Sequence, residues 1–440
     1  MMIRQIASAL LLALAVTAPQ ARAATGGPMT ADQAVQIALR QGTQAIQAEA
    51  SLLDARSGLW SAYSGVLPHV SADASRSGGK TRESSPSGIT DDRGYNGSYG
   101  LSGSWGVLNL SSWASVSSAR RGSAAAKYER AATRAQIVLD TKRQFYEVVK
   151  SMHLARVSAQ ALKLSRDDER RVRALYEVGS VSKSDLLKAR VRTSQSELDS
   201  LVADHNVTAQ RVRLATQLGL SESALGDVDS TLSTATAGAD AAAIMAEART
   251  NRPDVKAAEA SYASAQWRLR SVQLSRLPSV SATGSYTPKS VSSSSYVSPI
   301  DGPQSGSGWA KGDMSGRLAL SMSLFDGLAT EARVASARAG EMRARETRDA
   351  LLRNLDSEVR IAVLGYTEAT ERESLARRTL ESASENLNLV QQKYNVGSAT
   401  ILDLIDSQVQ LQRAQSDLVS AMAAIRVAEA ELDQVRGRGE

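Results

Sequence analysis

Proline divides this sequence unevenly, and that division limits the folds open to it. Two long stretches contain no proline, one between Pro86 and Pro253 and the other from Pro303 to the C-terminus. Since proline breaks helix interiors, long helices can form only in these stretches. Aromatic residues make up 4% of the chain and cysteine is absent. This composition suits helices packed through small residues, and it excludes disulfide frameworks and thiol nucleophiles.

The second proline-free stretch carries a heptad pattern, in which small and apolar residues recur at alternating spacings of three and four. The two runs are Leu352, Leu355, Val359, Ala362, Tyr366, Ala369, Glu373, Ala376, Leu380, Ala383, Leu387, Val390 and Tyr394, and then Leu411, Ala414, Leu418, Ala421, Ile425, Ala428, Leu432 and Val435. Such spacing is typical of coiled-coil packing. Between the runs, Gly397 can adopt the left-handed conformation that ends a helix. We therefore predict a helical hairpin over residues 328–436.

The first half of the chain repeats this plan. Residues 176–182 (YEVGSVS) match residues 394–400 (YNVGSAT) at an offset of 218, and residues 67–71 (LPHVS) match residues 277–281 (LPSVS) at an offset of 210. The chain therefore reads as two tandem copies of one unit. The helix predicted from Asn109 to Tyr176 has 68 residues, which corresponds to about 100 Å.

Each repeat also contains a predicted pair of strands after its Leu-Pro dipeptide. Apolar residues alternate with polar ones in each run; they are Val70, Ala72 and Ala74, then Tyr95, Tyr99, Leu101, Trp105 and Val107, then Val280, Ala282, Gly284 and Tyr286, and finally Leu318, Leu320, Met322 and Leu324. A run of about ten residues is long enough to cross a bilayer as a tilted strand. The Gly- and Ser-rich segments 77–94 and 289–316 are predicted to be exposed loops.

Four amphipathic strands cannot close a barrel by themselves, because the two edges would expose unpaired backbone groups to lipid. Two copies would give an eight-stranded barrel, whose interior is filled by side chains. Three copies would give a twelve-stranded barrel with an open lumen. A soluble coiled-coil protein with two Ser-rich hairpins is the alternative.

The N-terminus has the pattern of a secretory signal peptide. Arg4 precedes the apolar run from Ile6 to Val16, and Ala21-Arg22-Ala23 fits a cleavage site before Ala24. Removing Arg4 and Arg22 lowers the formal net charge from +6 to +4. No concentrated basic patch accompanies this charge, so we expect no nucleic-acid partner.

These features together resemble the TolC-type outer-membrane efflux and secretion channel family. The similar segments are Met29 to Leu39 at the N-terminal helix, the two Leu-Pro strand entries, Leu324-Phe325-Asp326-Gly327 at the last strand exit, and the turns at Tyr176 to Gly179 and Tyr394 to Gly397. The resemblance covers essentially the whole chain after the signal peptide.

The resemblance implies a mainly α fold with membrane β: a long coiled-coil α-helical barrel, and four β-strands per protomer contributing to a twelve-stranded trimeric β-barrel. It also implies the cell outer membrane as location, with the α-barrel in the periplasm and contacts to outer-membrane lipid. The implied partners are two further copies in a homotrimer, a periplasmic adaptor (membrane fusion) protein and an inner-membrane pump of RND or ABC type. The function would be the passive exit duct of a tripartite efflux pump or a type I secretion system. A periplasmic adaptor or a structural coiled-coil protein is the alternative.

The resemblance also implies roles for residues at the two turns. Asp403 and Asp406 would line a pore gate as acidic rings, and Asp185 with Tyr394 would hold the tip closed. The turn residues that would dock the adaptor are Val178, Gly179, Ser180, Val396, Gly397 and Ser398. Ala399 stands where a family member has an arginine, and Lys183 of the other turn is the candidate substitute.

We expect the following division of the chain: 1–23 signal peptide, 24–66 first helical segment, 67–108 membrane β-hairpin, 109–218 helical hairpin with a turn near 176–184, 219–239 equatorial linker, 240–276 first helix of the second repeat, 277–326 second membrane β-hairpin, 327–436 second helical hairpin with a turn near 394–400, and 437–440 tail.

Nothing in the sequence indicates catalysis. His69, His153 and His205 lie on separate predicted elements and lack metal-ligand spacing. The run Asp167-Asp168-Glu169-Arg170-Arg171 reads as a solvated stretch of helix. We therefore predict no enzyme activity, no cofactor and no metal.

Overall fold

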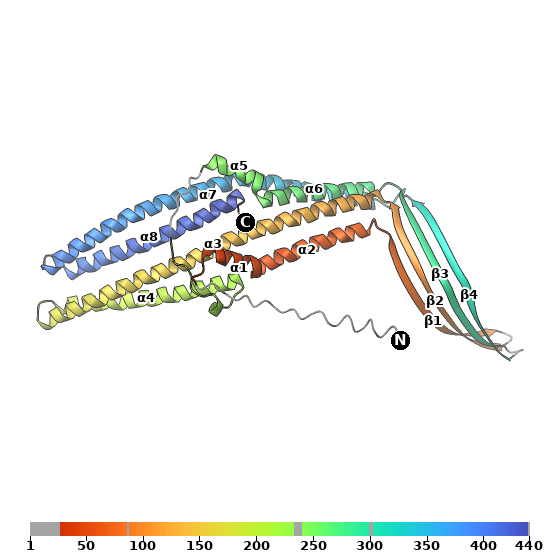
Figure 1. Ribbon diagram of the computed structural model, residues 1–440, viewed down its shortest axis with the longest axis horizontal. Helices are drawn as coiled ribbons and strands as arrows, with labels where there is room; N and C mark the ends of the chain where they lie inside the picture. The colour runs from red at the N-terminus through yellow and green to blue at the C-terminus, as the bar shows by residue number, and fades with distance from the viewer. Residues whose placement is uncertain (1–26, 86–87, 233–239, 299–301, 439–440) are drawn as a thin grey trace. The chain divides into compact units, whose positions relative to one another are not determined.

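The fold is built on two very long helices, as the proline-free stretches predict. The computed structural model describes residues 27–85, 88–232, 240–298 and 302–438, so the predicted signal peptide lies outside the described residues. The elements are α1 (Ala31–Gln41), α2 (Thr43–Ser64), β1 (His69–Ser85), β2 (Gly88–Leu108), α3 (Leu110–Glu177), α4 (Lys183–Leu218), η1 (Glu222–Ala224), α5 (Ala241–Asn251), α6 (Pro253–Leu274), β3 (Ser279–Ser298), β4 (Gly302–Ser321), α7 (Ala329–Asn395) and α8 (Ile401–Arg436). Figure 1 shows α3 folding back through a tight turn into α4, and α7 likewise into α8. None of the helices in these ranges is long and apolar enough to cross a membrane.

Left-handed glycines end both long helices. Gly179 has a φ of 75° and Gly397 a φ of 78°. After α3, Ser180 N–H donates to Leu175 O at 2.8 Å and Gly179 N–H to Tyr176 O at 2.9 Å. The equivalent bonds follow α7, so both turns are Schellman motifs. The predicted helix ends are therefore confirmed, together with the duplication of the turn.

The chain divides into two compact units. The first comprises Met1–Ala38, Thr141–Thr234 and Leu375–Ala423, and the second comprises Leu39–Asp140, Ala235–Ser374 and Ala424–Glu440. In the second unit, heptad residues of α7 and α8 such as Val359, Tyr366 and Leu432 pack against Ile244 and Ala248 of α5. All the buried apolar residues of α7 occupy predicted seam positions: Leu355, Val359, Ala362, Tyr366, Ala369 and Ala376.

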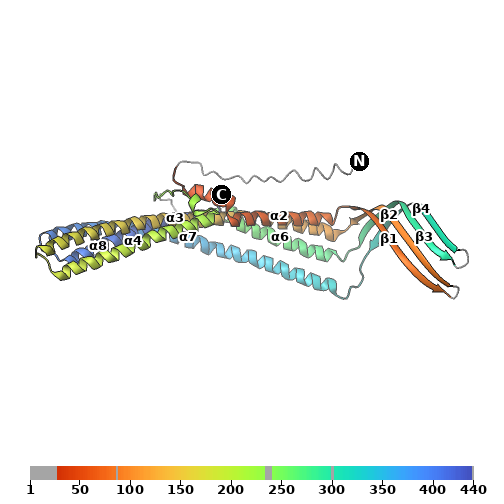
Figure 2. The same cartoon turned by 90° about the horizontal axis from the view of Figure 1, so that it is seen from below.

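A four-stranded antiparallel sheet occupies part of the second unit, with strand order β1-β2-β3-β4 (Figures 1 and 2). The strands contain 17, 21, 20 and 20 residues. The prediction that segments 77–94 and 289–316 are loops was therefore wrong, because both are paired strand over most of their length. Their Gly and Ser content suggested loops, but in register each strand provides its neighbour with backbone partners.

A β-bulge near the middle of the sheet shifts the register between β2 and β3 by one residue. Leu101 pairs with Tyr286, whereas Tyr99 pairs with Lys289, so β3 carries one extra residue there. Pro288 lies in this bulge, a position that does not require a proline N–H. A Cβ on Gly312 would lie 2.6 Å from Pro288 O, and one on Gly100 would lie 3.0 Å from Tyr286 O. Both glycines therefore permit the close backbone approach that the bulge requires.

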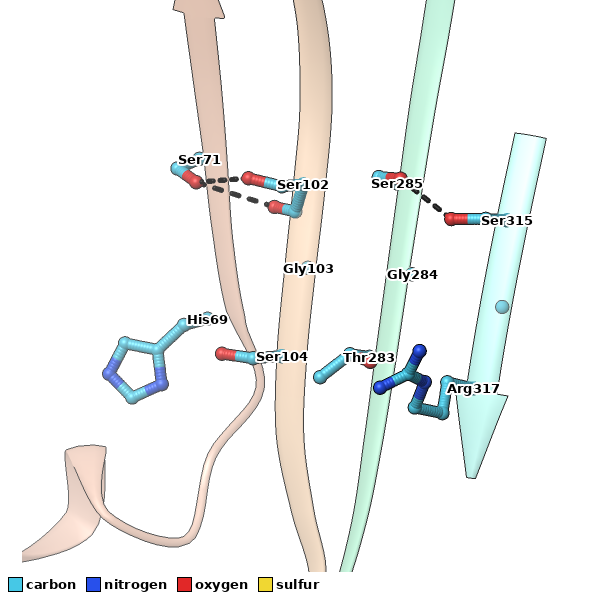
Figure 3. Close-up of a pocket in the computed structure, with 11 residues that line it drawn as sticks. His69, Ser71, Ser102, Gly103, Ser104, Thr283, Gly284, Ser285, Ser315 and Arg317 are labelled. Carbon is cyan, nitrogen blue, oxygen red and sulfur yellow. Dashed lines mark hydrogen bonds between the residues drawn. The ribbon is translucent and has the colours of Figure 1, made fainter. Parts of the chain in front are cut away.

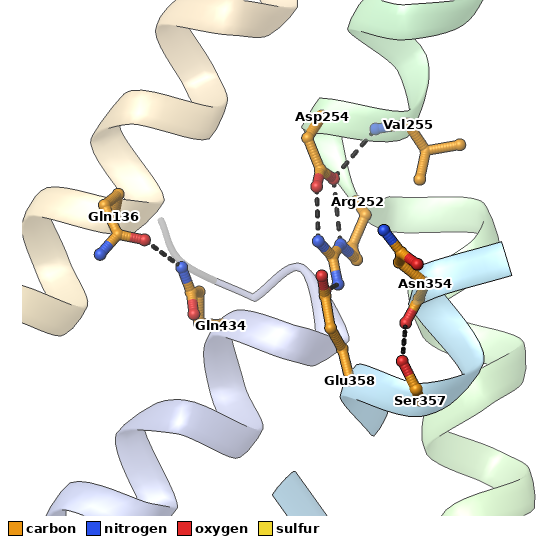
Figure 4. A network of polar contacts seen from close by, with 8 residues as sticks. All are labelled: Gln136, Arg252, Asp254, Val255, Asn354, Ser357, Glu358 and Gln434. Atoms are coloured by element: carbon orange, nitrogen blue, oxygen red, sulfur yellow. Dashed lines mark hydrogen bonds and ion pairs between the residues drawn. The ribbon is translucent and has the colours of Figure 1, made fainter. Parts of the chain in front are cut away.

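An ion-pair cluster joins α5, α6 and α7 in the second unit (Figure 4). Arg252, at the α5–α6 junction, donates to Asp254 Oδ2 at 2.5 Å and to Glu358 Oε2 at 2.6 Å. Close to this cluster, Gly437 ends α8 with a φ of 78°, and a Cβ there would lie 2.9 Å from Arg252 N. The end of α8 thus touches backbone that the Arg252 cluster fixes.

This packing predicts that alanine substitutions at Gly397 and Gly437, which have the same φ, will lower stability by different amounts. Gly397→Ala meets open space, so it should cost only the left-handed strain of about 1–2 kcal/mol. Gly437→Ala adds a backbone clash and should lower the thermal midpoint further. Circular dichroism at 222 nm during heating of detergent-solubilised protein measures both. Equal midpoints for the two variants would contradict the packing at Gly437.

Candidate functional site

The two turns carry matched helix caps. Thr400 N–H and Oγ1–H donate to Asp403 Oδ2 at 2.8 and 2.7 Å, and Asp403 N–H donates to Thr400 Oγ1 at 3.2 Å. At the first turn, Asp185 N–H donates to Ser182 Oγ at 3.1 Å and Ser182 Oγ–H donates to Asp185 Oδ2 at 2.7 Å. Both aspartates thus occupy the third helical position, and their carboxylates serve the caps of α8 and α4.

Asp403 and Asp406 lie one turn apart and both are exposed. The hydrogen bonds from Thr400 hold the pKa of Asp403 below its usual range, and Gln410 Nε2 donates to Asp406 Oδ2 at 2.7 Å. Two accessible carboxylates therefore follow the second turn, and Asp403 stays ionised to lower pH than an isolated aspartate.

The two turns lie close together in the first unit. Val172, Leu186 and Ala189 from α3 and α4 form one buried cluster with Ile401 and Leu404 from α8. Between the turns lies a groove of about 700 Å³, lined by residues of both hairpins. The structure therefore brings together the segments that the duplicated motif marks 218 positions apart.

Tyr394 and Asp185 both line this groove. Burial raises the pKa of the Tyr394 hydroxyl, and the negative charges of Asp168 and Asp185 raise it further while Arg171 lowers it. Among the described residues, the hydrogen bonds of the Asp185 carboxylate come from Ser182 and Lys188, the latter at 3.4 Å. A hydrogen bond from Tyr394 to Asp185 is not among them, so the role of these two residues in holding the tip closed stays a prediction.

Asp168 was placed in a solvated stretch by the sequence analysis, and that interpretation was wrong. Its side chain is 14% exposed, and Gln408 Nε2 donates to its Oδ2 at 2.5 Å, which joins α3 to α8. Arg171 stands 3.8 Å away on the same helix. Burial raises the pKa of Asp168, against the opposing effects of Gln408 and Arg171. Charged neighbours in the sequence concealed this contact, and no local motif distinguishes Asp168 from Asp167.

The residues predicted to dock a partner are the exposed parts of both turns. Val178 is 74% exposed and Val396 is 79% exposed, and each directly precedes the left-handed glycine of its turn. The two following serines are exposed as well. Each hairpin therefore presents one apolar side chain to solvent on a rigid turn.

The two faces of the sheet carry different kinds of side chain. The apolar face carries Val70, Leu101, Tyr286, Met314, Leu318 and Leu320, which the strand register places on one side. Met314 is 82% exposed and Leu318 is 73% exposed. The serine face carries Ser71, Ser102, Thr283, Ser285 and Ser315, with His69 and Arg317 at one end (Figure 3). On the serine face, Ser71 bonds Ser102 at 2.8 Å and Ser285 bonds Ser315 at 2.8 Å.

Two segments, residues 34–220 and 244–438, match the family model described as outer membrane efflux protein. The chain belongs to the outer membrane efflux protein family. The two matched segments coincide with the two repeats, and the resemblance suggested by the motifs is confirmed. Family membership also supports the outer membrane as location, and it agrees with the prediction that the chain is not an enzyme.

Solved structures share the fold. The Campylobacter jejuni CmeC outer membrane channel superposes with a TM-score of 0.79 at 16% identity, covering 93% of this chain and 86% of that one. The Vibrio cholerae outer membrane protein VceC gives a TM-score of 0.75 at 18% identity, covering 92% and 96%. The predicted fold class, mainly helical with four strands per chain and two repeats, is thereby confirmed.

Two curated relatives are both called Nodulation protein T. The one from Rhizobium leguminosarum bv. trifolii is 25% identical over 270 residues, and the one from bv. viciae is 24% identical over 286 residues. These matches cover 60% and 63% of this chain. The chain spans 55% and 57% of the relatives' own length, a little over half.

The buried carboxyl group of Asp168 on α3 predicts that the stability of the protein depends on pH. Because its pKa is raised on folding, the folded state binds this proton more tightly than the unfolded chain. The contribution of Asp168 to the free energy of unfolding should therefore fall as pH rises from about 4 through the folded pKa. Asp168→Asn should flatten this dependence and raise the thermal midpoint at neutral pH, as measured by circular dichroism from pH 4 to 7. Asp167→Asn, at the more exposed neighbour, is the matched control and should keep the wild-type slope. An unchanged slope in Asp168→Asn would rule out the raised pKa.

Proposed function

We propose that this protein is the passive exit duct of an export system in the outer membrane, working as a homotrimer. The sheet carries this proposal. Its apolar face is exposed over Val70, Met314, Leu318 and Leu320, while its opposite face is lined with serines. An exposed apolar face backed by a polar one fits a wall that separates lipid from water.

The edges of this sheet explain why several copies are needed. In the described part of the chain, β1 and β4 each pair on one side only. An open edge in lipid leaves backbone groups without partners, at several kcal/mol for each group. Joining β4 of one copy to β1 of the next removes these edges, and three copies give twelve strands around an open lumen.

The helical repeats support the same closure. Asp168 of α3 bonds Gln408 of α8 within one chain. At the repeat offset of 218, the equivalent of Asp168 is Asn386 on α7 and the equivalent of Gln408 is Arg190 on α4. Both equivalents are exposed. In a closed trimer, Asn386 of one copy would meet Arg190 of the next, so the contact that joins the two hairpins recurs between copies.

The partners follow from the family and from the exposed turns. A periplasmic adaptor would dock at Val178, Gly179 and Ser180 and at their counterparts Val396, Gly397 and Ser398. An inner-membrane pump of RND or ABC type would drive export through this contact, in a tripartite efflux pump or a type I secretion system. The groove between the hairpins, which includes Asp185 and Tyr394, would open when the partner binds.

The assembly and the duct are tested together. Detergent-extracted protein should have the mass of a trimer by light scattering, and it should conduct ions in planar bilayers of phosphatidylcholine. A monodisperse monomer that fractionates with soluble periplasmic proteins would overturn the proposal and favour an adaptor or a structural coiled coil.

The gate gives a second test. Three copies of Asp403 and Asp406 would place up to six carboxylates around the opening, and such rings favour cations. Asp403→Asn/Asp406→Asn should therefore weaken cation selectivity and block by multivalent cations in single-channel recordings, while the trimer persists. The amide at 403 can still accept the Thr400 bonds, so α8 keeps its cap. Asp417→Asn, an exposed carboxylate farther along α8, is the matched control. Unchanged selectivity in the double variant would leave these residues as helix caps only.

A further inference from the structure

A groove of about 480 Å³ lies between α6 and α7 in the second unit. Small residues form much of its walls, and three arginines line it, Arg268 on α6 and Arg333 and Arg343 on α7. None of the residues that the structure describes along these walls is acidic. A groove that is lined by cations and lacks carboxylates attracts anions.

Two of the three arginines have no counter-ion. Within the described ranges of the chain, neither Arg268 nor Arg343 forms an ion pair, and Arg343 Nε–H donates to Ala339 O of its own helix at 3.3 Å. Arg333 differs from them, because its Nη2 lies 3.5 Å from Asp326 Oδ2. The positive charges of Arg268 and Arg343 in this groove are therefore not compensated by the chain itself.

Serine hydroxyls add neutral donors to the same walls. Ser261 and Ser264 of α6 and Ser336 of α7 line the groove. The Ser264 hydroxyl donates to Ser118 O of α3 at 2.9 Å. The hydroxyls of Ser261 and Ser336 have no hydrogen-bond partner in the part of the chain that the structure describes. Guanidinium groups together with hydroxyls are the donors that suit carboxylates and phosphates.

Gly340 leaves space beside these donors. It lies in the interior of α7, where glycine is a poor helix former, and its φ is not positive. A Cβ at this position would have no described atom within 4 Å. Neither the backbone conformation nor the packing of the described chain therefore requires glycine here, and its missing side chain leaves room for a bound molecule.

We propose that this groove binds small polyvalent oxyanions, which carry two or more carboxylate or phosphate groups. Charge-assisted hydrogen bonds from Arg268 and Arg343 hold the anionic groups, and the hydroxyls of Ser261 and Ser336 donate further bonds. The bound anion supplies the missing counter-charge between α6 and α7, so it stabilises the folded protein. The site includes neither the two turns nor the sheet, and it therefore goes beyond the proposed export function.

The test titrates the purified protein in neutral detergent with citrate and with pyrophosphate, by isothermal calorimetry. Both anions should bind and should raise the thermal midpoint. Arg268→Gln/Arg343→Gln should weaken binding at least about tenfold. Arg270→Gln/Arg345→Gln is the matched control, because it removes two charges from the same helices at positions that do not line the groove. This control should bind both anions as wild type does.

Two further variants separate charge from space. Arg268→Lys/Arg343→Lys keeps both charges but loses the planar fork, so its affinity should lie between those of wild type and the glutamine variant. Gly340→Leu keeps the arginines but fills the groove, so it should abolish binding while the circular dichroism at 222 nm stays unchanged.

The site would be overturned by wild-type affinity in Gly340→Leu or in Arg268→Gln/Arg343→Gln, by an equal loss in the control, or by wild-type protein that binds neither anion. Conductance in planar bilayers is measured separately. Wild-type protein that conducts but binds neither citrate nor pyrophosphate would remove the site and keep the duct, whereas binding without conductance would do the reverse.

Discussion

Backbone hydrogen bonding at the edges of the sheet is the constraint on which the rest of the molecule depends. A four-stranded sheet with an exposed apolar face is unstable alone in water, because Met314, Leu318 and their neighbours lack cover. It is equally unstable alone in lipid, because β1 and β4 each lack a partner on one side in the described chain. Association of copies through the edges would satisfy the unpaired backbone groups, and lipid against the apolar face would cover Met314, Leu318 and their neighbours. In the proposed trimer, the same closure would bring the helices that enter and leave each strand pair into a ring.

The helical part could be predicted closely from the sequence, because its determinants are local. The proline-free stretches contain α3 and α7, and a glycine with a positive φ ends each of these helices. The buried apolar residues of α7 occupy the predicted heptad positions. The strands were predicted in the right place but at about half their length. Their outer halves lack the alternation of apolar and polar residues that marks a half-buried strand, and pairing with a neighbouring strand, which is a nonlocal interaction, holds them.

The candidate site was predictable in position but less so in its contacts. The duplicated Gly-containing turns marked the segments that line the groove, and Asp403 was predicted to line a pore gate. What the sequence could not show is that the carboxylate of Asp403 serves as a helix cap, since an aspartate at the start of a helix fits a cap and a pore ring equally. Asp168 was missed because its burial arises from α8, 240 positions away in the chain. A contact between distant helices leaves no trace in the residues around either partner.

The alternation of side chains along a strand lets one sheet present two different faces. In its inner half, apolar residues face one side and hydrogen-bonded serines the other, which suits lipid and water. A shift of one residue in the pairing of a strand would move all of its side chains to the opposite face of the sheet. The bulge at Pro288, which Gly100 and Gly312 make room for, inserts one residue into β3 relative to β2 and therefore changes the alternation of faces along that strand.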